Sequence, residues 1–279
     1  MEDIILIIEK EGIMTKKERI MKRLHEHYQV VLDKGYETIG IFLQGSQNYG
    51  LDYEDSDIDT KVIVLPKFND FLMNKKPVST TLVLENDEHI DLKDIRLMFD
   101  CFRKQNINFV EILFTEYKIL NPKYKAIFNQ LIKNNEYIAR YNTFAAVNCM
   151  AGMSYEKYKA LEHPYPAIMD KIEKFKYDPK QLHHIIRINE FIDRYANDVC
   201  YKDCLISEHK ERLIEIKKGF YTLDEAREVA QSMVGDTRFV KDRYMEENEP
   251  KTDKGVDELL NSVLLDIMKL NFKSELEIL

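Results

Sequence analysis

The spacing of apolar and polar residues predicts both helices and strands in the first part of the chain. Apolar residues recur at helical spacing over residues 16–32, and Gly35 follows as a typical helix stop. Residues 38–43 and 58–65 are short apolar runs of the kind found in buried strands. This segment is therefore expected to fold as a helix followed by two strands.

A hairpin and a further helix are predicted next. Residues 80–84 and 89–92 have the composition of strands and flank the polar turn 85–88. Apolar positions at helical spacing return over residues 94–104.

From Pro122 onward the pattern is helical. It predicts an α+β protein in which a small mixed-sheet domain, residues 1–135, is followed by an all-helical domain, residues 136–279, that closes a cleft. The expected helices cover residues 122–134, 141–161, 179–196, 207–216, 223–245 and 256–270.

Length and composition support this division and exclude several classes of protein. A chain of 279 residues exceeds what one hydrophobic core usually organises, and its 44% hydrophobic and 32% charged residues are ordinary for a globular protein. No apolar run is long enough to span a membrane, and the acidic start does not resemble a signal peptide. Four unevenly placed cysteines do not form a disulfide framework, so we expect a cytoplasmic protein.

The net charge of −8 disfavours a uniformly basic surface that would coat a nucleic acid. A local basic groove remains compatible with this balance, because a substrate responds to the charges that surround it.

Candidate chemistry is concentrated in residues 44–64. A predicted strand leads into Gly45 and Ser46, and Asp57 and Asp59 begin the next strand. Alternate residues of a strand share a face, so both carboxylates should point the same way and repel each other. A shared divalent cation would remove this repulsion, and hard oxygen ligands suit Mg²⁺.

Asp91 is the candidate for a third carboxylate, because apolar neighbours place it on a strand. If that strand lies beside the one that carries Asp57 and Asp59, the three acids converge and can hold two Mg²⁺ ions, for which Mn²⁺ can substitute. Gly45 lets a phosphate approach the backbone, and Ser46 can donate hydrogen bonds to it. Together these features are typical of a nucleotidyl-transfer centre.

Other interpretations of the acidic segment are weaker. An EF-hand calcium loop requires glycine and glutamate where this chain has Thr60 and Pro66. The Walker A and Gly-x-Gly-x-x-Gly motifs are absent. A solvated acidic loop remains an alternative, but it does not explain why the acids lead into Val62, Ile63 and Val64.

The chain resembles the DNA polymerase beta nucleotidyltransferase superfamily in the ordered set of Gly45-Ser46, Asp57-x-Asp59 and a later strand carboxylate. Within it, the chain is most similar to the predicted nucleotidyltransferases of the RNA repair pathway DNA polymerase beta family. The matching segments are residues 45–50, 56–59, 91, 106–113 and 177–187. Lys61-Val62 departs from the pattern, because the metal strand of this family is expected to run into a glycine at this point.

The resemblance implies a Mg²⁺-dependent transfer of a nucleoside monophosphate from an NTP, with ATP expected, to an acceptor hydroxyl. Asp57 and Asp59 would bridge both ions. Asp91 would hold the catalytic ion and assist deprotonation of the acceptor. Gly45 and Ser46 would bind the β- and γ-phosphates. The implied acceptor is an RNA, such as a damaged tRNA end.

A second group of candidates lies on the predicted helix 179–196. Lys180, His184 and Arg187 are spaced to share one face, which would meet the triphosphate or the acceptor's phosphates; a solvent-facing basic stripe is the alternative. Tyr49, beside the glycine-serine turn, is the candidate base-stacking platform. His183 is expected to have a packing or surface role.

Residues 106–113 contribute two further candidates. Asn108 and Glu111 fit either supporting positions at the cleft or helix capping.

Two alternative functions stay open at this point. The same chemistry could transfer AMP to a protein hydroxyl, as in toxin–antitoxin nucleotidyltransferases, or a nucleotide to a small molecule. The fold could also serve as a non-catalytic nucleotide-binding module, which would bind NTP without releasing pyrophosphate.

Overall fold

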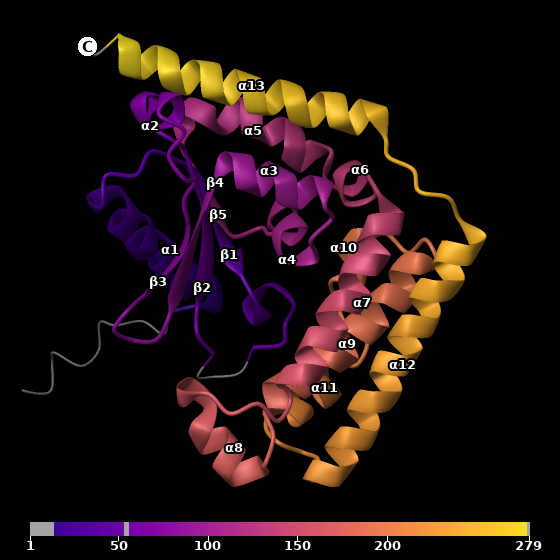
Figure 1. Ribbon diagram of the computed structural model, residues 1–279. Coiled ribbons are helices and arrows are strands. Elements are labelled where there is room, and N and C mark those ends of the chain that lie inside the picture. Colours follow the sequence, from indigo (N-terminus) through magenta and orange to yellow (C-terminus); the bar gives the residue numbers. More distant parts are fainter. Residues whose placement is uncertain (1–13, 53–55, 278–279) are drawn as a thin grey trace, which may run out of the picture.

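A five-stranded mixed sheet forms the centre of the N-terminal part in the computed structural model, which describes residues 14–52 and 56–277 (Figure 1). The strand order is β3-β4-β2-β1-β5. β2 and β4 run parallel, and every other neighbouring pair is antiparallel. The strands are β1 (Thr38–Gln44), β2 (Asp59–Val64), β3 (Ser79–Val83), β4 (His89–Asp94) and β5 (Lys118–Leu120).

One face of the sheet is covered by α1 (Lys16–Asp33). Thr15 and Glu18 form a capping box that begins this helix. Val31 of α1 packs in one apolar cluster with Val62 and Ile90, which face this side of the sheet. Alternation along β2 therefore places residues 60, 62 and 64 toward α1 and residues 59, 61 and 63 toward the opposite side.

The opposite face is covered by α3 (Ile95–Arg103) and α5 (Pro122–Lys133). Asp94 and Asn121 cap these two helices through their side chains, so each helix begins where a strand ends. Ile63 belongs to the large cluster on this side, which continues without a break into the helical part of the molecule. The two parts thus share one hydrophobic core.

The second part is helical and is built around three long helices, α7 (Thr143–Ala160), α9 (Pro179–Ala196) and α12 (Leu223–Glu247), which pack against one another (Figure 1). Shorter helices connect these long helices or lie between elements of the sheet part. These are α2 (Phe68–Leu72), α4 (Ile107–Val110), α6 (Asn135–Ala139), α8 (Met169–Phe175), α10 (Tyr201–Cys204) and α11 (Lys210–Lys217), with 3₁₀ turns η2 (Ser46–Asn48), η3 (Glu111–Leu113) and η4 (Pro166–Ile168).

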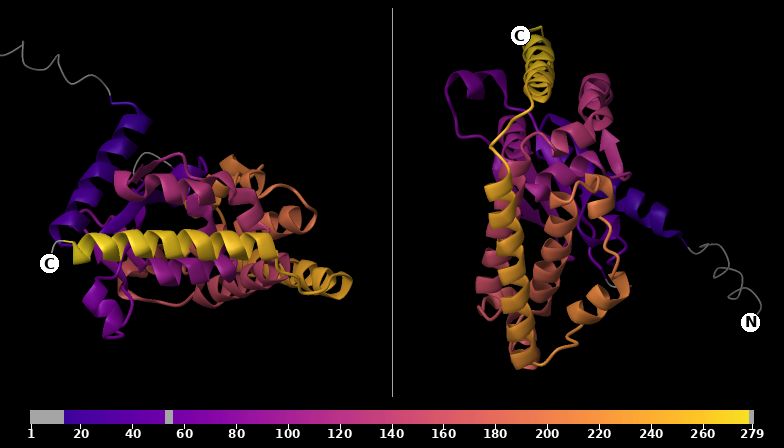
Figure 2. Two further views of the ribbon diagram at one scale, coloured as in Figure 1. Left: turned by 90° about the horizontal axis from the view of Figure 1, so that it is seen from above. Right: turned by 90° about the vertical axis from the view of Figure 1, so that its right-hand side faces the viewer.

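The last helix, α13 (Lys254–Leu276), returns to the sheet part and lies over α5 and α3 (Figures 1 and 2). Asn271 anchors it: its side-chain amide donates to the carbonyl of Pro66 at 3.0 Å and accepts from the Tyr124 hydroxyl at 3.0 Å. The division predicted at residue 135 stays a prediction.

The α+β fold class is confirmed. The long helices and the hairpin lie close to their expected ranges, and α9 matches its range at both ends. The sequence pattern missed β5, α2, α4, α6, α8 and α10, each of which has only three to seven residues. Segments this short do not complete two helical turns, so no periodicity marks them. No helix of the described chain has the length and apolarity that crossing a bilayer requires.

Asn271→Ala should destabilise the fold by about 2–3 kcal/mol, because it leaves the buried carbonyl of Pro66 without its donor. Urea unfolding followed by circular dichroism would measure the change. Asp266→Ala, at an exposed position of the same helix, is the control and should stay within about 0.5 kcal/mol of wild type. Equal midpoints for both variants would show that Asn271 does not anchor α13.

Candidate functional site

A cavity of about 250 Å³ lies between the ends of β1 and β2 and the helices α8, α9 and α11. We call it the carboxylate cavity. Its sheet side brings together Gly45, Ser46, Asp57 and Asp59, and its helical side brings together Lys171, Lys180, His184, Arg187 and Lys217. Carboxylates on one wall therefore face a basic wall supplied by the second half of the chain.

The turn at Gly45 and Ser46 is built by local geometry. Gly45 has a φ of 85°, a value that residues with a Cβ rarely adopt, and the 3₁₀ turn η2 starts directly after it. Asn48 holds the turn: its amide donates to the carbonyl of Leu43 at 2.9 Å and accepts from the Thr115 hydroxyl at 2.6 Å. The chain therefore leaves β1 with Ser46 at the cavity.

Asp57 and Asp59 both line the cavity, as their alternate positions predicted. Burial raises the pKa of Asp57, and the nearby charge of Asp59 raises it further. Lys180 on the opposite wall acts in the other direction. The two carboxylates thus repel each other, and a cation between them would be favoured.

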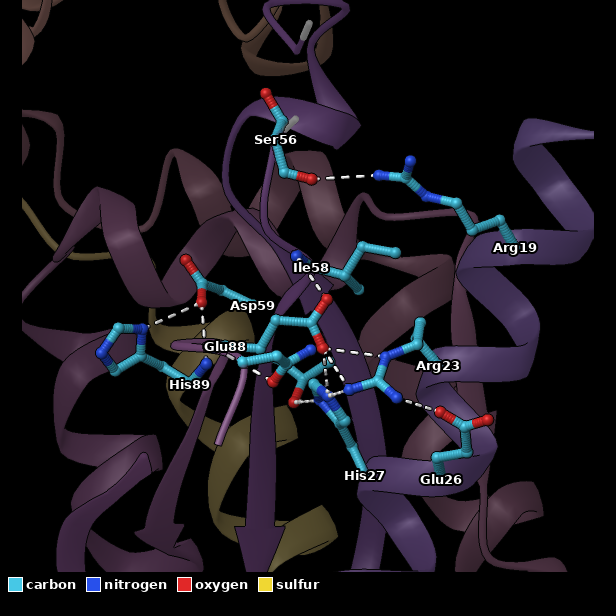
Figure 3. A network of polar contacts seen from close by, with 11 residues as sticks. Arg19, Arg23, Glu26, His27, Ser56, Ile58, Asp59, Glu88 and His89 are labelled. Carbon is cyan, nitrogen blue, oxygen red and sulfur yellow. Dashed lines mark hydrogen bonds and ion pairs between the residues drawn. The ribbon is translucent and has the colours of Figure 1, made fainter. Parts of the chain in front are cut away.

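Side chains of helix α1 make polar contacts with the segment that carries these acids (Figure 3). Arg19 donates to the backbone carbonyl of Ser56 at 3.0 Å. His27 lies 3.0 Å from the hydroxyl of Thr60 and 3.0 Å from Glu88. Nε2 of His27 faces Glu88 and also lies 3.3 Å from the Arg23 guanidinium, while Nδ1 faces Thr60.

Glu88, in the turn before β4, binds both this segment and helix α1. One of its oxygens accepts from the backbone N–H of Ile58 at 3.2 Å, and the other accepts from Arg23. Burial acts to raise the pKa of Glu88, but the hydrogen bonds from Arg23 and other neighbours outweigh it and lower the pKa. The backbone of Ser56 and Ile58 and the side chain of Thr60 are therefore bound by α1 and Glu88, while Asp57 and Asp59 line the cavity.

Asp59 is also held from β4. The backbone N–H of His89 donates to Oδ1 of Asp59 at 2.9 Å, and the imidazole of His89 lies 3.2 Å from the same oxygen (Figure 3). These contacts orient the Asp59 carboxylate at the mouth of the parallel β2–β4 pair.

Asp91 does not join the other two acids, contrary to the sequence prediction. Its strand does lie beside β2, but the register places Asp91 opposite Lys61 rather than Asp59. The carboxylate lies 3.7 Å from the Lys61 ammonium, and it is not part of the lining of the carboxylate cavity. In the described residues, no three histidine, cysteine, aspartate or glutamate side chains are grouped in a way that could hold a metal ion.

Lys180, His184 and Arg187 all face the cavity, as their helical spacing predicted. Asp178 caps α9 by accepting from the Lys180 backbone N–H at 2.9 Å, and Pro179 occupies the first turn. The start of α9 is thereby defined, which places Lys180 at the cavity.

The two neighbouring histidines are uncharged at neutral pH. Burial lowers the pKa of His184 well below its usual value, so this side chain offers a hydrogen bond rather than a charge to an anion. His183 is buried and donates to the carbonyl of Leu213 at 3.0 Å, which agrees with the expected packing role. Burial lowers its pKa to about 4.

Tyr49 does not have the placement that a base-stacking platform requires. Only 2% of it is exposed, its hydroxyl donates to Glu111, and the Arg187 guanidinium covers its ring at 3.8 Å from the centroid. Tyr49 instead links the sheet part to α9.

Glu111, one of the supporting candidates, lies at the centre of this link. Burial raises its pKa, while the charges of Lys61 and Arg187 act to lower it. Asn108 does not cap its helix, because Asn106 accepts from its backbone N–H at 3.2 Å and supplies that cap. Asn108 and Glu111 both line a second cavity of about 210 Å³, which shares Gly45 and Arg187 with the first.

Sequence reasoning missed several residues at the site. Lys171 reaches the basic wall from α8, which was not predicted, and Lys217 reaches it from the end of α11, which was predicted over residues 207–216 without marking this lysine. Glu88 was treated only as part of the turn before β4. Its contact with the backbone of Ile58, thirty residues earlier in the chain, was not predicted. No signal local to the sequence identifies these three residues.

The residues present fit one divalent cation between Asp57 and Asp59, because both carboxylates line the cavity and their negative charges repel each other. The predicted pair of ions held by three carboxylates does not fit this arrangement, because Asp91 is already paired with Lys61.

Comparison with known proteins adds little to this geometry. No protein-family model matches the chain, and no curated protein matches it significantly. Among solved structures, the chain is similar to a nucleotidyltransferase-like protein from Exiguobacterium sibiricum 255-15, at 11% identity over 83% of this chain and 80% of that chain, with a TM-score of 0.29. A TM-score this low does not support an argument about function.

Glu88→Ala should destabilise the protein by about 3 kcal/mol, because it removes the buried partner of Arg23 and the acceptor for the Ile58 N–H. Urea unfolding at pH 7 would measure this. Glu85→Ala, exposed in the same turn, is the matched control and should be close to neutral. Equal free energies of unfolding for the two variants would show that Glu88 does not hold residues 56–60 in place.

The variant His183→Asn should lose less free energy of unfolding than wild type as the pH falls. In the folded protein the pKa of His183 is about 4, against 6.5 for the free side chain. Its contribution is therefore complete above pH 6.5 and is lost as the pH falls toward 4, because the unfolded chain then binds the extra proton. The difference in free energy of unfolding between wild type and variant should therefore decrease by up to about 3 kcal/mol from pH 6.5 to pH 4.

Urea unfolding at several values between pH 7.5 and 4 would measure the gap. His163→Asn, at an exposed position, is the control and should leave the pH profile unchanged. A constant gap for His183→Asn would contradict the prediction.

Proposed function

We propose that this protein is a Mg²⁺-dependent nucleotidyltransferase that moves a nucleoside monophosphate from an NTP to an acceptor hydroxyl. The observation that carries the proposal is the carboxylate cavity, in which Asp57 and Asp59 face a wall of lysine and arginine beside the Gly45–Ser46 turn. Such a cavity suits a triphosphate that must be held near a metal ion.

In the proposed reaction the acceptor oxygen attacks the α-phosphorus of the NTP. A bond forms between these two atoms, the bond from the α-phosphorus to the bridging oxygen breaks, and pyrophosphate leaves. The hydroxyl proton passes to bulk water. The negative charge that develops on the departing pyrophosphate needs stabilisation by cationic groups.

The residues of the cavity divide this work. Lys180 and Arg187 bind the phosphates from the helical side, and His184, which is neutral, donates a hydrogen bond to them. Asp57 and Asp59 hold the Mg²⁺, and this ion when bound polarises the α-phosphate. Asp91 has no contact with substrate in this proposal, because it does not line the cavity.

For the donor and acceptor we propose ATP and an RNA end. The resemblance to the RNA repair nucleotidyltransferases favours this choice, and the exposed Lys171 and Lys180 at the cavity suit the phosphates of an RNA end. A local basic wall of this kind is compatible with the overall charge of −8.

Asp57→Asn and Asp59→Asn should each reduce nucleotidyl transfer by about a thousandfold, since a metal contribution of several kcal/mol is lost. The assay incubates protein, Mg²⁺, α-labelled ATP and RNA and follows the label. Asp87→Asn, exposed in the β3–β4 turn, is the control and should retain full activity. Equal label transfer by wild type and both site variants would contradict the proposed chemistry.

The same assay separates the acceptors. Label in RNA supports the proposed acceptor, whereas label in a protein band would replace it with a protein hydroxyl. ATP binding without pyrophosphate release would favour a non-catalytic binding module.

A further inference from the structure

Lys61 is a buried ammonium on the same strand face as Asp59. Only 2% of the residue is exposed, although it lies two positions beyond a cavity-lining carboxylate. A lysine is almost never buried to this extent unless its charge is compensated. Its surroundings must therefore supply negative or polar partners.

Three groups surround the Lys61 ammonium. It donates a hydrogen bond to the side-chain carbonyl of Gln44, it lies 3.7 Å from the carboxylate of Asp91, and it sits 4.7 Å from the centre of the Phe109 ring. The carboxylate of Glu111 is a further electrostatic partner. The ammonium is thus held from several sides by acceptors and carboxylates.

This arrangement has a consequence for cation binding. Asp91 is the residue that would have to ligate a second divalent ion, and the ammonium of Lys61 is its partner instead. A divalent ion that bound Asp91 beside a buried ammonium would be strongly repelled. The strand register places the two residues directly opposite each other on β2 and β4.

We propose that Lys61 takes the place of a second divalent ion, so that the site binds one divalent cation at Asp57 and Asp59 and the side chain of Lys61 occupies the position beside Asp91 that a second ion would need. This inference rests on the proposed function in assuming that the carboxylate pair holds a metal ion.

The number of bound ions tests the proposal without any measurement of activity. Mn²⁺ is titrated into the full-length protein without nucleotide, and electron paramagnetic resonance counts the bound ions. We expect one Mn²⁺ per chain in wild type and none in Asp57→Asn/Asp59→Asn. Two ions in wild type would overturn the inference and leave the proposed function standing. No bound ion in wild type would overturn both.

Variants at the lysine give the second part of the test. Lys61→Met should bind two ions, because Asp91 is released from its partner, and one ion would overturn the inference. Lys93→Met is the matched control: Lys93 lies on β4 at 4.5 Å from the same Phe109 ring but donates to the hydroxyl of Ser79. It should still bind one ion.

Asp91→Asn covers the case in which Lys61→Met does not fold. With Lys61 intact, this variant should still bind one Mn²⁺, and its dissociation constant should stay within about twofold of wild type. A tenfold or greater loss of affinity would show that Asp91 ligates the ion and would overturn the inference.

Discussion

The site depends on the hydrogen bonds that α1 and Glu88 make with residues 56–60. The carbonyl of Ser56, the N–H of Ile58 and the hydroxyl of Thr60 are all bound on one side of this segment. Thr60 and Asp59 are neighbours on β2, so the binding of Thr60 on one side turns Asp59 to the other side. Two like charges are thereby kept side by side at the cavity, a position that they would leave if the backbone were free to turn.

The opposite wall depends on how the helical part docks. Arg187 of α9 lies on the ring of Tyr49, and the hydroxyl of Tyr49 donates to Glu111. This chain of contacts crosses the junction between the two parts and sets the position of the basic wall relative to the carboxylates. A continuous hydrophobic core lies behind this chain of contacts, so buried apolar packing also joins the two parts.

Much of the candidate site could be predicted because its members are neighbours in sequence. Asp57 and Asp59 share a face through the two-residue period of a strand, and Lys180, His184 and Arg187 share one through the turn of a helix. The positive φ of Gly45 is likewise a local property. The elements of three to seven residues were missed, among them α8 with Lys171, because segments this short leave no periodic signature. The helix that carries Lys217 was predicted, but nothing in its pattern pointed to the cavity.

The sequence by itself determined the periodic elements, the α+β class and the two local sets of charged residues, since these follow from the interactions of residues close along the chain. Only the tertiary structure decided the pairing of β2 with β4, which sets Asp91 opposite Lys61 instead of beside Asp59. It also decided that the ring of Tyr49 is covered by Arg187. Strand register and helix docking depend on contacts between distant segments, and a shift of two residues in a register moves a carboxylate by about 7 Å without changing any local pattern.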